Sequence, residues 1–188
     1  MHCTRATLAV VMLSVACVYA QGTSTQSPAD VRTLEAFKQS VTQYALLHKR
    51  LESTIPKLPA DADPQAIDQH QLKLGQLVMD ARRRAKRGDV FTPEAERLFR
   101  RLLGQVFSGP EGARLKATIM DENPTLVKLA VNARYPDQVP FSTMPPQVLA
   151  VLPRLPEEVE YRFIGNQLIL LDIHAHTIVD YIDRALPK

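Results

Sequence analysis

Cysteine is scarce in this chain of 188 residues, and both copies, Cys3 and Cys17, lie within the first twenty residues. Removal of that segment leaves no thiol to form a disulfide, attack a substrate or ligate a metal. Tryptophan is absent, and 7 glycines leave little room for glycine-rich phosphate loops. The sequence also lacks the G-x-S-x-G, H-E-x-x-H, P-loop and G-x-G-x-x-G patterns. These absences favour a protein without enzymatic activity and without a cofactor.

The first twenty residues are typical of a secretory signal. A short basic start (1–5) precedes an apolar run (6–17), and Val18-Tyr19-Ala20 supplies small residues at the two positions that a signal peptidase reads. We therefore predict a signal peptide over 1–20, cleaved after Ala20, and a periplasmic or secreted protein. The run is shorter than the roughly 20 apolar residues of a span, so no transmembrane span is expected after cleavage. Lipidation at Cys17 is the alternative.

Helix starts are marked by four dipeptides in which a capping side chain precedes proline. They are Ser27-Pro28, Asp63-Pro64, Thr92-Pro93 and Asn123-Pro124. Apolar residues at helical spacing predict helices over about 28–55, 64–87, 93–107, 110–121 and 124–134. The short connection 56–63 predicts that the first two helices form an antiparallel hairpin.

The pattern changes after residue 134. Six prolines between 135 and 158 predict an extended linker, in which only Pro146 to Leu152 could form a short helix. Apolar runs at Val159–Ile164, Leu168–Leu171 and Ile178–Ile182 then predict a three-stranded antiparallel β-meander. We expect Asp172 to cap the turn between the last two strands.

The expected fold class is therefore mainly α (α+β). In chain order we expect a signal peptide (1–20), a flexible tether (21–27), an antiparallel helical hairpin (28–87), a short helical bundle (88–134), a Pro-rich linker (135–158) and a β-meander (159–188) packed on the helices.

The region from about 88 to 187 resembles an uncharacterised family of exported bacterial proteins. The residues that carry the resemblance are Gly88–Glu94, Gly109–Gly112, Asp121–Pro124, Tyr135-Pro136, Ser142–Pro146, Glu160–Gly165, Asp172 and Ile178–Asp180. Members usually show Ala-Asn-Leu before Ile-Val-Asp, whereas this chain has Ala175-His176-Thr177. The family has no assigned activity, so the resemblance implies export and little more.

Four histidines follow the signal, and they suggest two pairs. His48 and His70 each replace an apolar residue on the seams of the hairpin, at similar distances from its connection. His174 and His176 are spaced i, i+2 beside Asp172. Either pair could bind a divalent metal ion or titrate near neutral pH, and the alternatives are a polar layer that fixes helix register and an exposed loop. No carboxylate is expected on the hairpin seam.

Charge is nearly balanced, with 23 Lys and Arg against 20 Asp and Glu, so nucleic acid is not an expected partner. One basic patch stands out, formed by Arg82, Arg83, Arg84, Lys86 and Arg87. These cations could stabilise a helix C-terminus or bind an envelope protein or an anionic surface. We expect an exported protein that acts by protein–protein or cell-envelope contact. A periplasmic divalent-metal or pH-responsive binder is the alternative, followed by a hydrolase with an unrecognised site.

Overall fold

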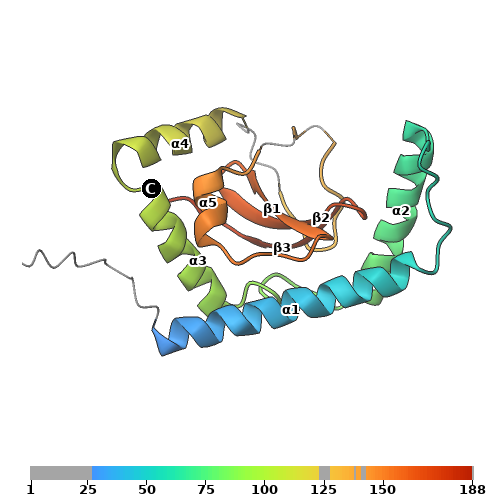
Figure 1. Cartoon of the computed structure of the whole chain (residues 1–188), viewed down its shortest axis with the longest axis horizontal. Helices are drawn as coiled ribbons and strands as arrows, with labels where there is room; N and C mark the ends of the chain where they lie inside the picture. The colour runs from blue at the N-terminus through green and yellow to red at the C-terminus, as the bar shows by residue number, and fades with distance from the viewer. Residues whose placement is uncertain (1–26, 123–127, 138, 141–142, 188) are drawn as a thin grey trace, which may run out of the picture.

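Helices lead into a C-terminal antiparallel sheet in the computed structural model, which describes residues 27–122, 128–137, 139–140 and 143–187 (Figure 1). The elements are α1 (Pro28–Glu52), α2 (Pro64–Ala81), α3 (Pro93–Val106), α4 (Gly109–Glu122), α5 (Pro146–Val151), β1 (Val159–Ile164), β2 (Gln167–Asp172) and β3 (Thr177–Ile182). The α+β class with a terminal three-stranded meander is confirmed. The predicted signal peptide lies outside the described residues, as does the tether up to residue 26.

Three of the four expected helix starts form as predicted. The side chains of Ser27, Asp63 and Thr92 accept hydrogen bonds from the backbone N–H three residues ahead, and proline follows each of them. Each cap therefore pairs one of the N–H groups that a helix start leaves without a partner. The fourth start, Asn123-Pro124, lies outside the described residues.

The sheet has the order β1-β2-β3, with β2 in the centre. Every residue of β2 is buried, which explains why Leu168–Leu171 is continuously apolar rather than alternating. Leu168 and Leu170 face a core shared with the helices, whereas Ile169 and Leu171 belong to a second cluster on the opposite face. Both faces of the sheet are thus covered.

The main core lies between the sheet and the helices α1 and α3. Phe37 of α1 packs against Phe91 and Phe99 with ring centroids 5.3 and 4.8 Å apart, and Phe99 reaches Tyr161 of β1 at 6.1 Å. Figure 1 shows α1 running along one side of the sheet, α3 and α4 near one end, and α2 near the other. The C-terminal half of α1 is thereby brought to the turn between β2 and β3.

The second face of the sheet is covered by a segment that we expected to be partly helical. We predicted a helix over 124–134, but the described residues of that range, 128–134, form no helix. Residues 132–135 instead follow the edge of β3, where the N–H of Asn132 donates to Ile178 O at 2.8 Å. Asn132 has a positive φ of 64°, which ends any helical path. Leu129 lies in the second cluster, so its burial on the sheet replaces burial in a bundle.

The proline-rich segment contributes to the core. The expected short helix is present as α5, and most of the remaining described residues of 135–158 have no regular structure. Tyr135 and Val139 nevertheless pack in the second cluster, and Met144, Val148 and Leu152 pack in the main core.

Helix α2 contacts α1, yet it is not laid antiparallel along it (Figure 1). Its buried residues, Leu74 and Val78, join the main core, and Gly75 faces the β2–β3 turn. A Cβ at Gly75 would lie 3.1 Å from Ala175 O, so glycine permits this close approach. Packing on the end of the sheet thus turns α2 away from the expected side-by-side hairpin.

Helix α2 also ends at Ala81, six residues before the predicted end at Arg87. Arg82 leaves the helical conformation with φ −107° and ψ 24°. Gly88, expected to cap the helix, has a φ of 92° in the following loop, and its N–H donates to the buried carboxylate of Asp180. Asp180 also accepts from the N–H groups of Val90 and Phe91 at 2.9 Å. This carboxylate therefore shapes the loop that replaces the last helical turn.

Candidate metal centre

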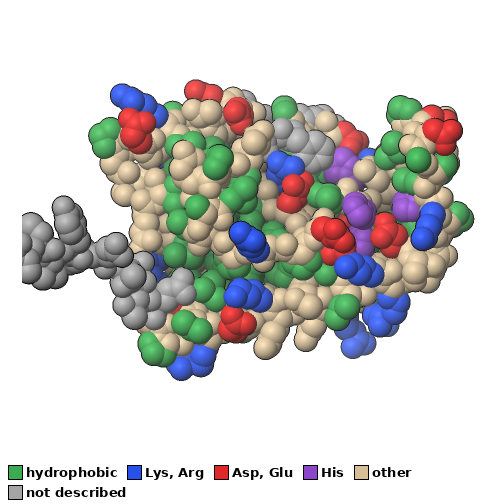
Figure 2. Space-filling view, in the orientation of Figure 1, with side chains coloured by type: hydrophobic (Ala, Val, Ile, Leu, Met, Phe, Trp, Pro, Cys, Tyr) green, Lys and Arg blue, Asp and Glu red, His purple; other side chains and the backbone are tan. Residues whose placement is uncertain are grey.

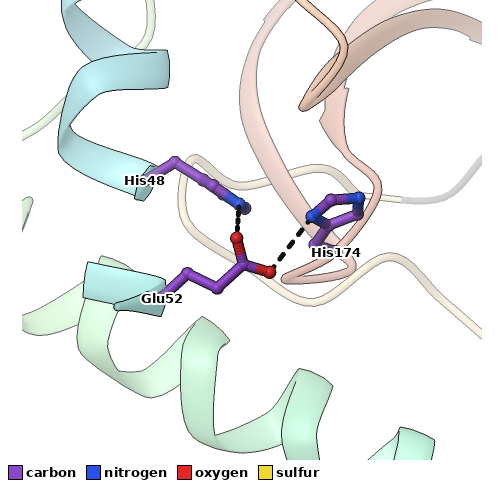
Figure 3. Close-up of side chains that lie close together, drawn as sticks. All are labelled: His48, Glu52 and His174. Carbon is purple, nitrogen blue, oxygen red and sulfur yellow. Dashed lines mark ion pairs between the residues drawn. The ribbon is translucent and has the colours of Figure 1, made fainter. Parts of the chain in front are cut away.

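Three potential metal ligands meet where the end of α1 reaches the β2–β3 turn: His48, Glu52 and His174 (Figure 3). The Glu52 carboxylate lies between the two imidazoles, with Oε2 3.4 Å from Nε2 of His48 and Oε1 3.2 Å from Nδ1 of His174. One atom from each residue can be chosen so that all three lie within 4.8 Å of one another. Ligands around a tetrahedral zinc ion stand about 3.3–3.5 Å apart, so a small contraction would suffice.

Two local features of the sequence place these side chains. His48 and Glu52 are four residues apart on α1, which puts them on the same face of the helix. His174 lies in the turn after Asp172, and Oδ1 of Asp172 accepts the N–H of His174 at 3.0 Å and of Ala175 at 2.7 Å. The predicted capping of this turn by Asp172 is confirmed.

The other oxygen of Asp172 holds His48. Oδ2 lies 2.6 Å from Nδ1 of His48 and accepts a hydrogen bond from the Tyr44 hydroxyl, also at 2.6 Å. All three side chains are buried. Because a carboxylate accepts, Nδ1 of His48 carries the proton, and in the neutral ring Nε2 is then a lone-pair donor. Within the part of the chain that the structure describes, this buried Nε2 forms no hydrogen bond, and Oε2 of Glu52 lies 3.4 Å from it.

The local charges set the protonation of this ring. Burial is the largest single influence and by itself lowers the pKa of His48, because it penalises the charged form. The hydrogen bond and charge of Asp172, with the charges of Glu52 and Glu158, outweigh burial and raise the pKa above its usual 6.5. Burial and then Asp172 raise the pKa of Tyr44 well above its ordinary value, so its hydroxyl stays a donor.

A groove of about 610 Å³ opens beside the three ligands. Glu52 and His174 form part of its wall, whereas His48 lies behind them. Lys49 also lines it, and its ammonium lies 2.8 Å from Oε1 of the nearly buried Glu158. Figure 2 shows histidines gathered with acidic and basic side chains over the end of α1 and the β2–β3 turn.

The structure combines the predicted histidines differently from either expected pair. It brings His48 next to His174, with ring centroids 5.3 Å apart. His70 lines the groove. His176 lies apart from the ligands, with Nδ1 3.2 Å from Oε1 of Gln71. The expectation that no carboxylate shares the seam of α1 was wrong, because Glu52 does; its i, i+4 spacing from His48 was the available signal.

The predicted basic patch is divided by the structure. The half-buried Arg82 donates to Oδ1 of Asn132 at 2.7 Å and to Val179 O, and lies over the ring of Tyr44. Arg87 pairs with Glu96 at 2.8 Å. The other three, Arg83, Arg84 and Lys86, are exposed and form no ion pair within the described residues. A contact surface here would rest chiefly on those three.

Comparison with known proteins assigns no role to the residues of this site. No family model, curated protein or solved structure matches this chain. The resemblance to exported bacterial proteins therefore remains an expectation. Among the described residues, no helix is both long and apolar enough to cross a membrane.

Proposed function

We propose that this protein binds a divalent transition-metal ion through Nε2 of His48, the Glu52 carboxylate and Nδ1 of His174. The observation that carries the proposal is the buried Nε2 of His48, which forms no hydrogen bond within the described residues and faces the other two ligands, with Oε2 of Glu52 3.4 Å away. A buried polar atom without a partner is costly, and a metal ion would satisfy it.

The environment of His48 supports this role. Metal-bound histidines usually donate their second N–H to a carboxylate, which fixes the ring and its tautomer. Asp172 stands in that position, 2.6 Å from Nδ1, and is itself held by Tyr44 and two backbone N–H groups. The imidazole of His48 is therefore held in one orientation before a metal arrives.

The ligand types select the metal. Two imidazole nitrogens and one carboxylate suit Zn²⁺, Ni²⁺ or Cu²⁺ and disfavour Ca²⁺ and Mg²⁺, which prefer oxygen ligands. Three protein ligands leave a tetrahedral ion with one open position, and the groove lies on the side of Glu52 and His174.

The test is calorimetric titration of the purified protein with Zn²⁺, Ni²⁺ and Cu²⁺. His174→Ala changes a half-exposed side chain and should lower zinc affinity by more than the roughly 10–100-fold cost of losing an outer-shell partner. His70→Ala is the matched control, because it removes a groove imidazole that is not among the three ligands. Zinc binding no tighter than about 1 mM, or equal losses in both variants, would overturn the proposal.

A second candidate function is contact with an acidic envelope partner through Arg83, Arg84 and Lys86. Their side chains are exposed and form no ion pair with any described residue, which favours it. Changing the three residues to Ser should abolish copurification of a partner that the wild-type protein retains. Retention of every partner would remove the patch from consideration.

Export is part of both proposals. We propose that the leader 1–20 is cleaved after Ala20 and that the protein acts in the periplasm or outside the cell. N-terminal sequencing of the native protein tests this directly, since cleavage predicts Gln21 as the first residue. An intact leader on the working protein would contradict it.

A further inference from the structure

The groove beside the proposed metal centre has an apolar wall that solvent reaches. Its apolar lining comes from Ile55, Leu58, Ile67 and Ile173. Leu58, Ile67 and Ile173 are 38%, 40% and 36% exposed, which puts them among the large hydrophobic residues that the described surface leaves uncovered. Exposed apolar side chains gathered around one concave site are typical of a ligand pocket. A volume near 610 Å³ suits a small molecule rather than a folded partner.

The charges around the groove favour an anionic head group. A divalent ion with Glu52 as its one anionic ligand keeps a net positive charge in its first shell. Lys57 lines the groove and is exposed without an ion pair in the described part of the chain, whereas Lys49 is neutralised by Glu158. The negative charge of Asp172 is buried behind His48 and does not line the groove.

Two of the three proposed metal ligands line the same groove as the apolar side chains. These two are Glu52 and His174, so an ion held there would be reached from the groove. A ligand that placed an oxygen at the open coordination position could lay an apolar chain along Leu58 and Ile67.

We propose that the groove binds a small carboxylate with an apolar chain, whose carboxylate occupies the open position of the metal ion. This inference rests on the proposed metal binding. The carboxylate supplies the anionic oxygen that the ion and Lys57 attract, and the chain covers the exposed Leu58, Ile67 and Ile173. Each methylene that becomes buried should strengthen binding about fourfold.

The experiment is calorimetric titration of octanoate into the zinc-loaded protein and into the same protein stripped of metal. Octanoate should bind the loaded form at least tenfold more tightly. Hexanoate should bind up to about 15-fold more weakly than octanoate, because two methylenes are missing. Octanamide, which keeps the chain but lacks the charge, should bind loaded and stripped protein alike and weakly.

Two pairs of variants localise the effect. The double change Leu58→Ser and Ile67→Ser should weaken octanoate binding at least tenfold and leave zinc affinity unchanged. The control is Leu72→Ser with Leu149→Ser, because both residues are 50% exposed and neither lines the groove. The control should change neither affinity.

The outcomes separate the two proposals. If zinc does not bind, metal binding and the carboxylate inference both fall. In another outcome, zinc binds while octanoate binds the loaded and the stripped protein equally, and binds the loaded protein no more tightly than octanamide does. In that case the inference is overturned and metal binding stands. Equal octanoate affinity in the groove and control variants would also overturn it.

Discussion

Oδ2 of Asp172 lies 2.6 Å from Nδ1 of His48, and both side chains are completely buried. This contact joins the end of β2 to the last two turns of α1 across 124 residues of sequence. The same carboxylate also shapes the turn that carries His174. Asp172 therefore positions two of the three proposed ligands.

The first prediction is that Asp172→Asn weakens both stability and zinc binding. The change removes the charge that pairs with His48 and places an amide where the carboxylate accepts from four donors. Breaking a buried pair of this kind costs about 3–5 kcal/mol in free energy of unfolding, and loss of the outer-shell carboxylate costs about 10–100-fold in metal affinity. Urea unfolding and zinc titration measure the two effects. Asp61→Asn in an exposed loop is the control, and equal behaviour of the two variants would contradict the role of Asp172.

The second prediction concerns pH in the absence of metal. Because the pKa of His48 is raised above 6.5 in the folded protein, the favourable contribution of this residue is fully present below about pH 6.5. It is lost as the pH rises through the raised folded-state pKa. The free energy of unfolding of the wild type should therefore fall over this range relative to that of His48→Gln. Urea unfolding in the presence of a chelator measures it.

An internal control is available in the same protein. Burial, followed by the charge of Arg134, lowers the pKa of His176 below 6.5. Imidazole signals followed by NMR should therefore titrate on opposite sides of 6.5 for His48 and His176. A His48 signal that titrates at or below 6.5 would refute the prediction.

The third prediction separates the loop of Asp180 from the metal centre. Asp180→Asn should lower the free energy of unfolding by at least about 3 kcal/mol, because the buried carboxylate accepts from the N–H groups of Gly88, Val90 and Phe91. Zinc affinity of the folded protein should not change, since this carboxylate is not among the groups at the proposed site. Chemical unfolding and titration in the absence of denaturant give both values. A large loss of zinc affinity would show that the loop and the site are coupled.

The sequence predicted the elements better than their arrangement. The starts at Ser27, Asp63 and Thr92 were predictable because capping is local chemistry within four residues. The strands were predictable because short apolar runs lay between evident turns. The region 128–134 was not, since its apolar run fits a helix as well as a segment packed on a sheet, and the positive φ of Asn132 decides between them.

The site was only partly visible in the sequence. His48 and His174 were both candidates, but each was assigned to a different partner, because the pairing depends on how α2 and the β2–β3 turn dock. Sequence separation says nothing about contacts that only the tertiary packing creates. Glu52 was missed although it follows His48 by one helical turn, a relation that the sequence itself contains.

The last prediction uses two adjacent arginines with different environments. The guanidinium of Arg82 is half-buried, donates to Asn132 and Val179 and lies 5.0 Å from the centre of the Tyr44 ring, whereas Arg83 is exposed. Arg82→Ser removes hydrogen bonds of a charged group and leaves Asn132 Oδ1 without that donor, so the free energy of unfolding should fall by about 1–3 kcal/mol. Arg83→Ser removes the same charge from the same turn and should stay within about 0.5 kcal/mol of the wild type. Urea unfolding at constant ionic strength distinguishes them, because an effect of net charge alone would destabilise or stabilise both variants equally. Equal stabilities of the two variants would mean that the contacts of Arg82 with Asn132 and Val179 do not stabilise the fold.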